Sequence, residues 1–375
     1  MFKVKKQRMR FSAILLVLFF CLCHLGISPV FASEPINETL SLDQAVSRAL
    51  KYSETVKKAV KEVERTEEIR NYRYQRLEGL STQPAFTAAV EVPRSQLLTS
   101  DLEWRMSKKS LTAEEDKIVL DACNKYWNIL KAQKELDQAE SALYSALKQL
   151  QVAQAGERVG ISLVTGMSPG QLLLSCEAQY KAAQAFLEAT KNNLNMAYTA
   201  LNQLIRLPID ERPVLADELI YERLEIDNLD YEVTKVLENH PQIWNAKEAV
   251  TMQEYLKNMM FYTGEYQPYE ARQIPVEQAQ LDVAKLKKIY EEATRFSYYA
   301  VKDLEESYEA LQENIKVNEE NLRIKNLLYE VGMATASEVA AEEQKVAKAR
   351  SDALGILCQH AYAKLAFQKP WAVSQ

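Results

Sequence analysis

The chain has 375 residues, of which 47% are hydrophobic and 26% charged, and its net charge is −6 at pH 7. This acidic balance disfavours nucleic acid and anionic membrane surfaces as partners, because both repel negative charge.

The N-terminus has the pattern of an export signal. A basic stretch is followed by an apolar run over residues 11–27 and by the small residue Ala32. We therefore expect cleavage after residue 32; the alternative is an uncleaved anchor, which the helix breaker Pro29 disfavours. The five basic residues of this segment have no acidic counterpart, so its removal takes the net charge from −6 to −11.

The remaining cysteines and histidines predict neither a disulfide framework nor a metal site. Cys123, Cys176 and Cys358 are odd in number and fall in helical patterns, so we interpret them as small apolar core residues. His240 and His360 have no second ligand at metal-binding spacing.

Three long helices are predicted in the first half of the chain, over residues 42–77, 112–154 and 171–205. The second carries Ile129, Leu136, Leu143 and Leu150 in one heptad row and alanines in a parallel row, and the third carries matching rows. Heptads of this length are typical of a coiled-coil seam. The alanines favour close approach of the two helices as an antiparallel hairpin. The connector that follows, residues 206–228, is expected to contain one short strand.

The second half predicts a helix that His240–Pro241 opens or interrupts, a very long helix over residues 276–331 and a last helix over residues 337–367. At about 1.5 Å per residue the long helix would measure roughly 80 Å, which indicates a rod-like molecule. Every proline after residue 32 is expected to lie outside helix interiors.

The two halves carry the same pattern. Residues 42–50 (LDQAVSRAL) recur as residues 229–237 (LDYEVTKVL), and the Val-Gly of 159–160 recurs at 331–332. Helical units of this kind bury their apolar stripe by packing against copies of themselves. The pattern predicts an assembly of duplicated hairpins.

These features resemble the TolC-type outer membrane efflux proteins. The resemblance rests on a signal peptide, on an L-x-x-A-[VL]-x-x-A-L opening at residues 42–50 that recurs at 229–237 with Glu232 and Val236 in place of the alanines, and on a turn. The turn has the pattern Gly-x-x-[ST]-x-x-[DE]-[VL] at Gly332, Thr335, Glu338 and Val339. It covers residues 40–367. It implies a homotrimer with a helical α-barrel, continued by a β-barrel, that receives substrates from an inner-membrane pump through a periplasmic adaptor (membrane fusion protein). It also implies the domains 1–32 (signal peptide), 33–228 (first repeat with connector) and 229–375 (second repeat).

The sequence departs from the family at the joints where membrane-spanning strands would lie. A spanning hairpin needs two strands of about 9–11 residues. Residues 81–110, with a possible strand at 86–92, are just long enough, but the polar segment 263–275 is too short. We therefore expect an all-α fold of duplicated antiparallel coiled-coil hairpins with little or no β-barrel. A second departure is Arg206, which replaces the glycine that often ends the third helix in this family.

The resemblance also implies functional residues at the hairpin turns, which form the pump-facing mouth of the family's tunnel. Gly160, Ser168, Gly332 and Thr335 are candidates for adaptor contact, although helix capping explains Ser168 and Thr335 equally well. Three carboxylates follow the second turn, and three-fold symmetry would multiply each into a ring that selects cations; the alternative is a solvated helix start. These residues are Glu338, Glu342 and Glu343.

The function expected from these observations is a passive conduit for small molecules or proteins in a tripartite exporter, located in the outer membrane or cell envelope. The alternative is an extracytoplasmic coiled-coil scaffold or adaptor-like protein that has lost the pore. No arrangement of residues points to catalysis or to a cofactor, so we expect no enzyme activity.

Overall fold

The computed structural model describes residues 39–79, 88–162, 167–259 and 268–373, all of which belong to one unit, Glu38–Gln375. The predicted signal peptide, residues 1–32, lies outside the described residues. In chain order the elements of the first half are β1 (Thr39–Leu40), α2 (Leu42–Tyr52), α3 (Glu54–Glu78), α4 (Ala88–Val159) and α5 (Pro169–Ile205). Those of the second half are β2 (Val214–Leu215), α6 (Leu229–Asn239), α7 (Pro241–Met259), α8 (Tyr269–Glu330), α9 (Ala336–Gln368) and the 3₁₀ turn η1 (Pro370–Ala372).

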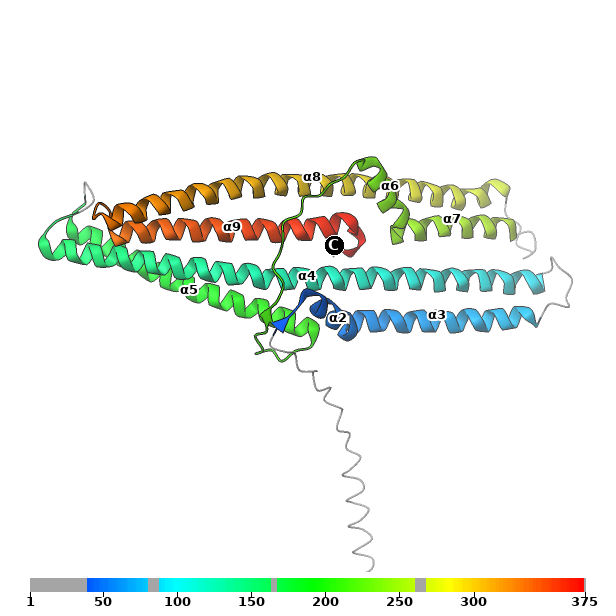
Figure 1. Ribbon diagram of the computed structural model, residues 1–375. Coiled ribbons are helices and arrows are strands. Elements are labelled where there is room, and N and C mark those ends of the chain that lie inside the picture. The colour runs from blue at the N-terminus through cyan, green and yellow to red at the C-terminus, as the bar shows by residue number, and fades with distance from the viewer. Residues whose placement is uncertain (1–38, 80–87, 163–166, 260–267, 374–375) are drawn as a thin grey trace, which may run out of the picture. The chain divides into compact units, whose positions relative to one another are not determined.

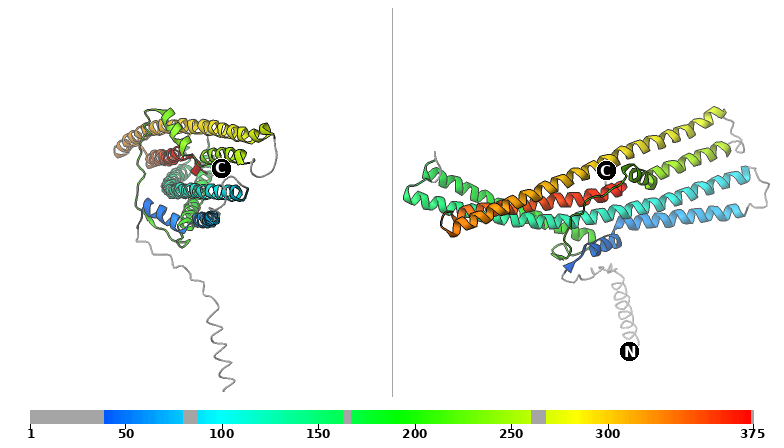
Figure 2. Two further views of the ribbon diagram at one scale, coloured as in Figure 1. Left: turned by 90° about the vertical axis from the view of Figure 1, so that its right-hand side faces the viewer. Right: turned by 45° about the horizontal axis from the view of Figure 1, so that its top comes forward.

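The long helices of this unit lie side by side in a layer. On the side of the hairpin turns the order is α8, α9, α4, α5, and on the other side it is α8, α7, α4, α3 (Figures 1 and 2). With 72 and 62 residues, α4 and α8 run through both sides, and α4 measures about 110 Å at 1.5 Å per residue. Within the described ranges, no helix combines the length and the apolar character that crossing a bilayer requires.

The alanine row predicted for the α4–α5 hairpin is buried. Ala132, Ala139, Ala146 and Ala153 are at most 8% exposed, and Cys176 on α5 packs against Ala153. Small side chains in the seam let the two helix axes approach closely. The three cysteines of the described residues are buried, as their interpretation as core residues requires.

Several predicted boundaries are wrong because helices extend further than the prolines suggested. Pro93 lies inside α4 and Pro275 inside α8, each in the second turn of its helix. A proline in the second turn cannot donate a backbone hydrogen bond, and its ring crowds the carbonyl four residues earlier. That carbonyl belongs to the first turn of the helix, which can adjust because no earlier turn restrains it, so the proline is tolerated there. The expected strand at 86–92 is helical from Ala88, so the segment 81–110 supplies no strand hairpin where it is described. The joint 263–275 is likewise helical from Tyr269 onward.

The first predicted helix is interrupted at Ser53, which divides it into α2 and α3. Ser53 leaves the helical conformation, and its hydroxyl accepts a hydrogen bond from the Val56 N–H at 3.2 Å. An N-cap of this kind starts a new helix in a new direction. The second half breaks at the matching place, because Pro241 keeps His240 out of the helical region and begins α7.

Arg206 itself ends α5. Its φ of 52° is left-handed, the conformation that glycine usually supplies at a helix C-terminus. Its guanidinium pairs with Glu54 at 2.6 Å. The C-terminus of α5 is therefore capped by a non-glycine residue in a strained conformation. This explains how α5 ends without the glycine that the sequence lacks.

The connector 206–228 crosses one face of the helix layer, from the end of α5 to α6 (Figure 1). It contains the single predicted strand, β2, which pairs in parallel with β1. Tyr126 on α4, 1% exposed, holds both strands: its hydroxyl donates to the Leu40 carbonyl and accepts from the Asp217 N–H, each at 3.1 Å.

The last part of the connector is attached to α8 by the fully buried carboxylate of Glu305. It accepts hydrogen bonds from the Leu224 N–H at 2.6 Å, from Lys302 at 2.8 Å and from Arg223 at 3.2 Å. Burial alone would raise the pKa of this carboxyl, but the three hydrogen bonds outweigh burial and hold the pKa below its usual value. His360 of α9 lies 3.5 Å away, so Glu305 joins the connector to two helices.

The break between α6 and α7 buries a neutral histidine. His240 is 1% exposed, and its ring lies against Tyr290 with 3.7 Å between the ring centroids. Its Nδ1 accepts a hydrogen bond from the Gln242 N–H at 3.3 Å. Burial lowers the pKa of His240 to about 4.

This lowered pKa predicts a loss of stability in acid. Between pH 6.5 and about 4 the unfolded chain binds a proton at His240 that the folded chain does not, so the free energy of unfolding falls as the pH falls, by about 3 kcal/mol over this range. Urea denaturation followed by circular dichroism at a series of pH values measures it. A His240→Gln variant should show a flatter dependence, and identical slopes would contradict the prediction.

Candidate functional site

The two hairpin turns lie at the same end of the helix layer and begin with the same backbone motif (Figure 1). At the second turn, the Met333 N–H binds the Leu328 carbonyl at 2.7 Å and the Gly332 N–H binds that of Tyr329 at 3.0 Å. At the first turn, Ile161 and Gly160 bind the carbonyls of Gly156 and Glu157 at 2.9 and 3.1 Å. This double bond pattern is a Schellman motif, which places a left-handed residue just after the helix.

Both candidate glycines occupy that left-handed position. The φ angles of Gly160 and Gly332 are 70° and 76°. A side chain at such an angle costs roughly 1 kcal/mol, whether or not there is space for it. The glycines therefore fix the direction in which the chain leaves α4 and α8.

Replacing Gly332 with alanine is expected to lower the free energy of unfolding by about 1 kcal/mol. The matched control is Gly79→Ala, because Gly79 has a right-handed helical φ of −62° and an added Cβ meets only ordinary contacts there. Urea denaturation of both variants measures the difference. Equal effects of the two substitutions would show that the left-handed angle does not matter.

The candidate residues Ser168 and Thr335 are helix N-caps. Each forms a capping box, Ser168 with Gln171 and Thr335 with Glu338. Four residues of the first turn, 163–166, lie outside the described residues. The side chains that end both turns thus have a local structural role, as the capping interpretation predicted.

The three candidate carboxylates have different surroundings. Glu338 accepts a hydrogen bond from the Thr335 N–H at 2.8 Å and pairs with Lys325, and these contacts, the backbone hydrogen bond first, lower its pKa. The side chain of Glu342 is 15% exposed and pairs with Lys345 at 2.8 Å. Glu343 is exposed and has no ion-pair partner among the described residues. The single chain uses the first two carboxylates locally and leaves the third available.

Apolar side chains are exposed on either side of both glycines. At the second turn Val331 and Met333 are 68% and 77% exposed, and at the first turn Val159 and Ile161 are 71% and 56% exposed. Exposed apolar groups close together commonly mark a contact surface. The sequence analysis identified the glycines and missed these apolar neighbours, although apolar residues flank both of the paired glycines in the sequence.

The two edges of the helix layer carry exposed apolar rows as well. On α8 the row consists of Ala310, Val317, Ile324 and Val331, seven residues apart, and we call it the α8 seam. Its valine and isoleucine members are 43–68% exposed. It lies on the face opposite the half-buried row of Tyr308, Ile315 and Leu322, because positions two apart point about 200° apart around a helix. In the sequence, a second heptad row in the same helix indicates the α8 seam, but the sequence analysis considered only the first row.

On α5 the exposed row lies away from α4. We call it the α5 seam; it consists of Leu174, Ala178, Ala185, Ala189 and Met196, and its leucine and methionine are 68% and 61% exposed. Each edge helix therefore has one apolar face buried within the chain and a second one facing outward. Long helices with an apolar row facing water are typical of chains that associate.

The sequence comparisons give no match: neither a family model nor a curated protein matches the chain. Solved structures do match. The Campylobacter jejuni CmeC outer membrane channel aligns with 88% of this chain and 85% of its own, at a TM-score of 0.60 and 14% identity. The Neisseria gonorrhoeae MtrE outer membrane channel, in its open state, aligns with 88% of each chain at a TM-score of 0.56 and 16% identity.

A third similar structure is the outer membrane protein VceC from Vibrio cholerae, aligned with 88% of this chain and 95% of its own at a TM-score of 0.58 and 12% identity. At these identities the similarity establishes the fold. The chain has the fold of these outer membrane proteins, so the predicted resemblance to the TolC type and the all-α coiled-coil fold are confirmed at the level of fold.

Proposed function

We propose that this protein is the subunit of a ring-shaped export conduit that lies in the outer membrane or elsewhere in the cell envelope. The observation that carries the proposal is the pair of exposed seams at opposite edges of one helix layer, α8 at one edge and α5 at the other. Contacts between two different surfaces of identical chains are head-to-tail, and such contacts close into rings when the rotation allows it. A closed ring of helix layers encloses a tunnel.

The number of subunits we propose is three, as in the TolC type. Two repeats per chain, residues 33–228 and 229–375, would then form a ring of six similar hairpin units. The order of the helices supports this division, because two shorter helices followed by two longer ones occur twice, as α2 to α5 and as α6 to α9. Residues 1–32 are proposed to be removed on export.

The hairpin-turn end is proposed to contact a periplasmic adaptor, which links the conduit to an inner-membrane pump. Gly160, Gly332, Ser168 and Thr335 would hold the turns, and the exposed Ile161 and Met333 would supply apolar contact area. Of the three carboxylates near this end, Glu343 is the one without a local partner among the described residues, so a carboxylate ring would depend first on Glu343.

Conductance in planar lipid bilayers tests the proposal. The purified full chain should open reproducible channels. A charge-neutralising Glu343→Gln variant should reduce the preference for cations if this carboxylate lines the tunnel. A pure, folded and oligomeric protein that never conducts would overturn the conduit and favour the scaffold alternative.

A further inference from the structure

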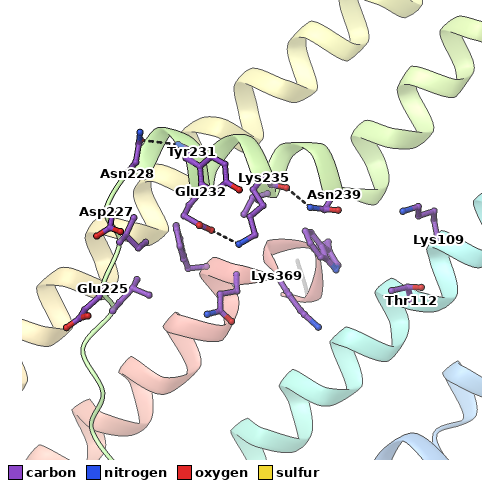
Figure 3. A pocket seen from close by; sticks show the side chains of 16 residues that line it. Lys109, Thr112, Glu225, Asp227, Asn228, Tyr231, Glu232, Lys235, Asn239 and Lys369 are labelled. Atoms are coloured by element: carbon purple, nitrogen blue, oxygen red, sulfur yellow. Dashed lines mark hydrogen bonds and ion pairs between the residues drawn. The ribbon is translucent and has the colours of Figure 1, made fainter.

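A second feature, away from the seams and turns, is a hollow of about 810 Å³ in the middle of the helix layer. It lies between α6, the end of the connector, α4 and the C-terminal end of α9 with η1 (Figure 3). Pockets for small organic ligands typically measure about 300–1,000 Å³. The size of this hollow is therefore that of a ligand site.

One wall of the hollow is aromatic and held in place. Asp116 accepts hydrogen bonds from the Trp371 indole at 2.8 Å and from Lys369 at 2.5 Å, so it fixes the side chains of Trp371 in η1 and of Lys369 just before it. Phe367, 2% exposed, lies beside them in the core. An aromatic surface fixed in this way offers apolar area and a π-face without first having to be ordered.

The charged side chains of α6 that line the hollow are paired with each other. Lys235 pairs with Glu232 at 3.0 Å, and the Asn239 amide donates to the Lys235 carbonyl at 2.8 Å. With Lys369 engaged by Asp116, two of the three lysines that line the hollow have a carboxylate partner.

The charges at the two ends of the hollow lack such partners. At the connector end, Glu225 and Asp227 make no hydrogen bond or ion pair with any described residue. At the opposite end, on α4, Lys109 is half-buried and has no carboxylate partner in the described part of the chain; its ammonium lies 5.9 Å from the centroid of the Trp244 ring. Figure 3 shows Lys109 at one end and the two carboxylates at the other.

We propose that this hollow binds an elongated organic zwitterion, with a cationic group at Glu225 and Asp227 and an anionic group at Lys109. The apolar middle of the ligand would lie along the Trp371 ring, which the buried Phe367 supports from the core. Complementary charges at both ends give such a site its selectivity, because a ligand with two like charges leaves one end repelled and unpaired. The inference is independent of ring formation and of conduction.

The test uses ω-aminooctanoate as the probe, with octane-α,ω-diamine and octanedioate as controls of the same length. Titration of the full chain by isothermal calorimetry should give saturable binding of the amino acid, about tenfold or more tighter than that of either control. Equal binding of the three molecules, or no saturable binding of ω-aminooctanoate, would overturn the proposal.

Two variants locate the site and the orientation of the ligand. Lys109→Met should weaken binding of ω-aminooctanoate about tenfold and leave binding of the diamine no weaker. The double variant Glu225→Gln, Asp227→Asn should weaken it similarly and leave binding of the dioate no weaker. The matched controls are Lys117→Met and Glu218→Gln, exposed residues of α4 and the connector that do not line the hollow. If the control variants lost as much affinity as the site variants, binding would lie elsewhere.

Discussion

Replacing Glu305 with alanine is expected to lower the free energy of unfolding by about 2–3 kcal/mol. The substitution removes a fully buried carboxylate that accepts hydrogen bonds from Lys302, Arg223 and the Leu224 N–H. The buried Leu224 N–H would lose its acceptor, and the Lys302 ammonium would keep only the Leu224 carbonyl, at 2.6 Å. A buried polar or charged group that is left without its partner destabilises the fold by more than the intact network stabilises it.

Urea denaturation monitored by circular dichroism measures this effect. Glu306→Ala is the matched control, because Glu306 also pairs with Arg223, at 3.1 Å, but has a side chain that is 73% exposed. A surface pair of this kind contributes about 0–1 kcal/mol. Glu305→Gln keeps the shape without the charge and should fall between the two. The prediction fails if Glu305→Ala destabilises no more than Glu306→Ala.

The second large effect is expected at the α8 seam. Substituting both Val317 and Ile324 with glutamate should leave the chain monomeric, whereas the proposed function requires the unaltered protein to form rings. Burying each side chain stabilises an interface by about 1.5–3 kcal/mol, and two carboxylates in its place must lose their water. The association constant should therefore fall by two or more orders of magnitude.

Native mass spectrometry and sedimentation velocity measure the assembly state. Asn326→Glu is the control: it adds a carboxylate to α8 at an exposed position on a different face from the seam. The double variant should keep the circular-dichroism spectrum of the parent, since both side chains are exposed in the single chain, and should lose conductance. A double variant that still forms rings would place the subunit contact elsewhere.

Periodic patterns made the helices and their core predictable, because heptad rows are local. The row from Ala132 to Ala153 fixed which face of α4 is buried, and the paired glycines located both turns. Local signals failed where packing decides the outcome. The β-branched residues around Val90 favoured a strand, but Val90 is 8% exposed within α4; the packing of α3 against α4 outweighs that propensity.

The features that attach the connector could not be predicted from the sequence, because they join residues far apart in the chain. The Tyr126 hydroxyl binds Leu40 across 86 positions, and Glu305 binds Leu224 across 81. The hollow beside α6 combines residues from four elements. No spacing rule links such positions, whereas the candidate glycines and N-caps depend on neighbours within five residues.

The continuous α4 helix also determines the order in which the molecule can fold. Its partner α9 is made last: Cys358 lies against the Trp127 carbonyl across 231 positions, and Lys369 against Asp116 across 253. Until synthesis is nearly complete, the flank of α4 that α9 will cover stays open to solvent, while the early α4–α5 hairpin forms from neighbouring segments. A chain whose apolar α4 surface is still uncovered is prone to aggregate. The yield of folded protein in cells should therefore rise with chaperones that hold unfolded chains, and it should fall if the last thirty or so residues are removed.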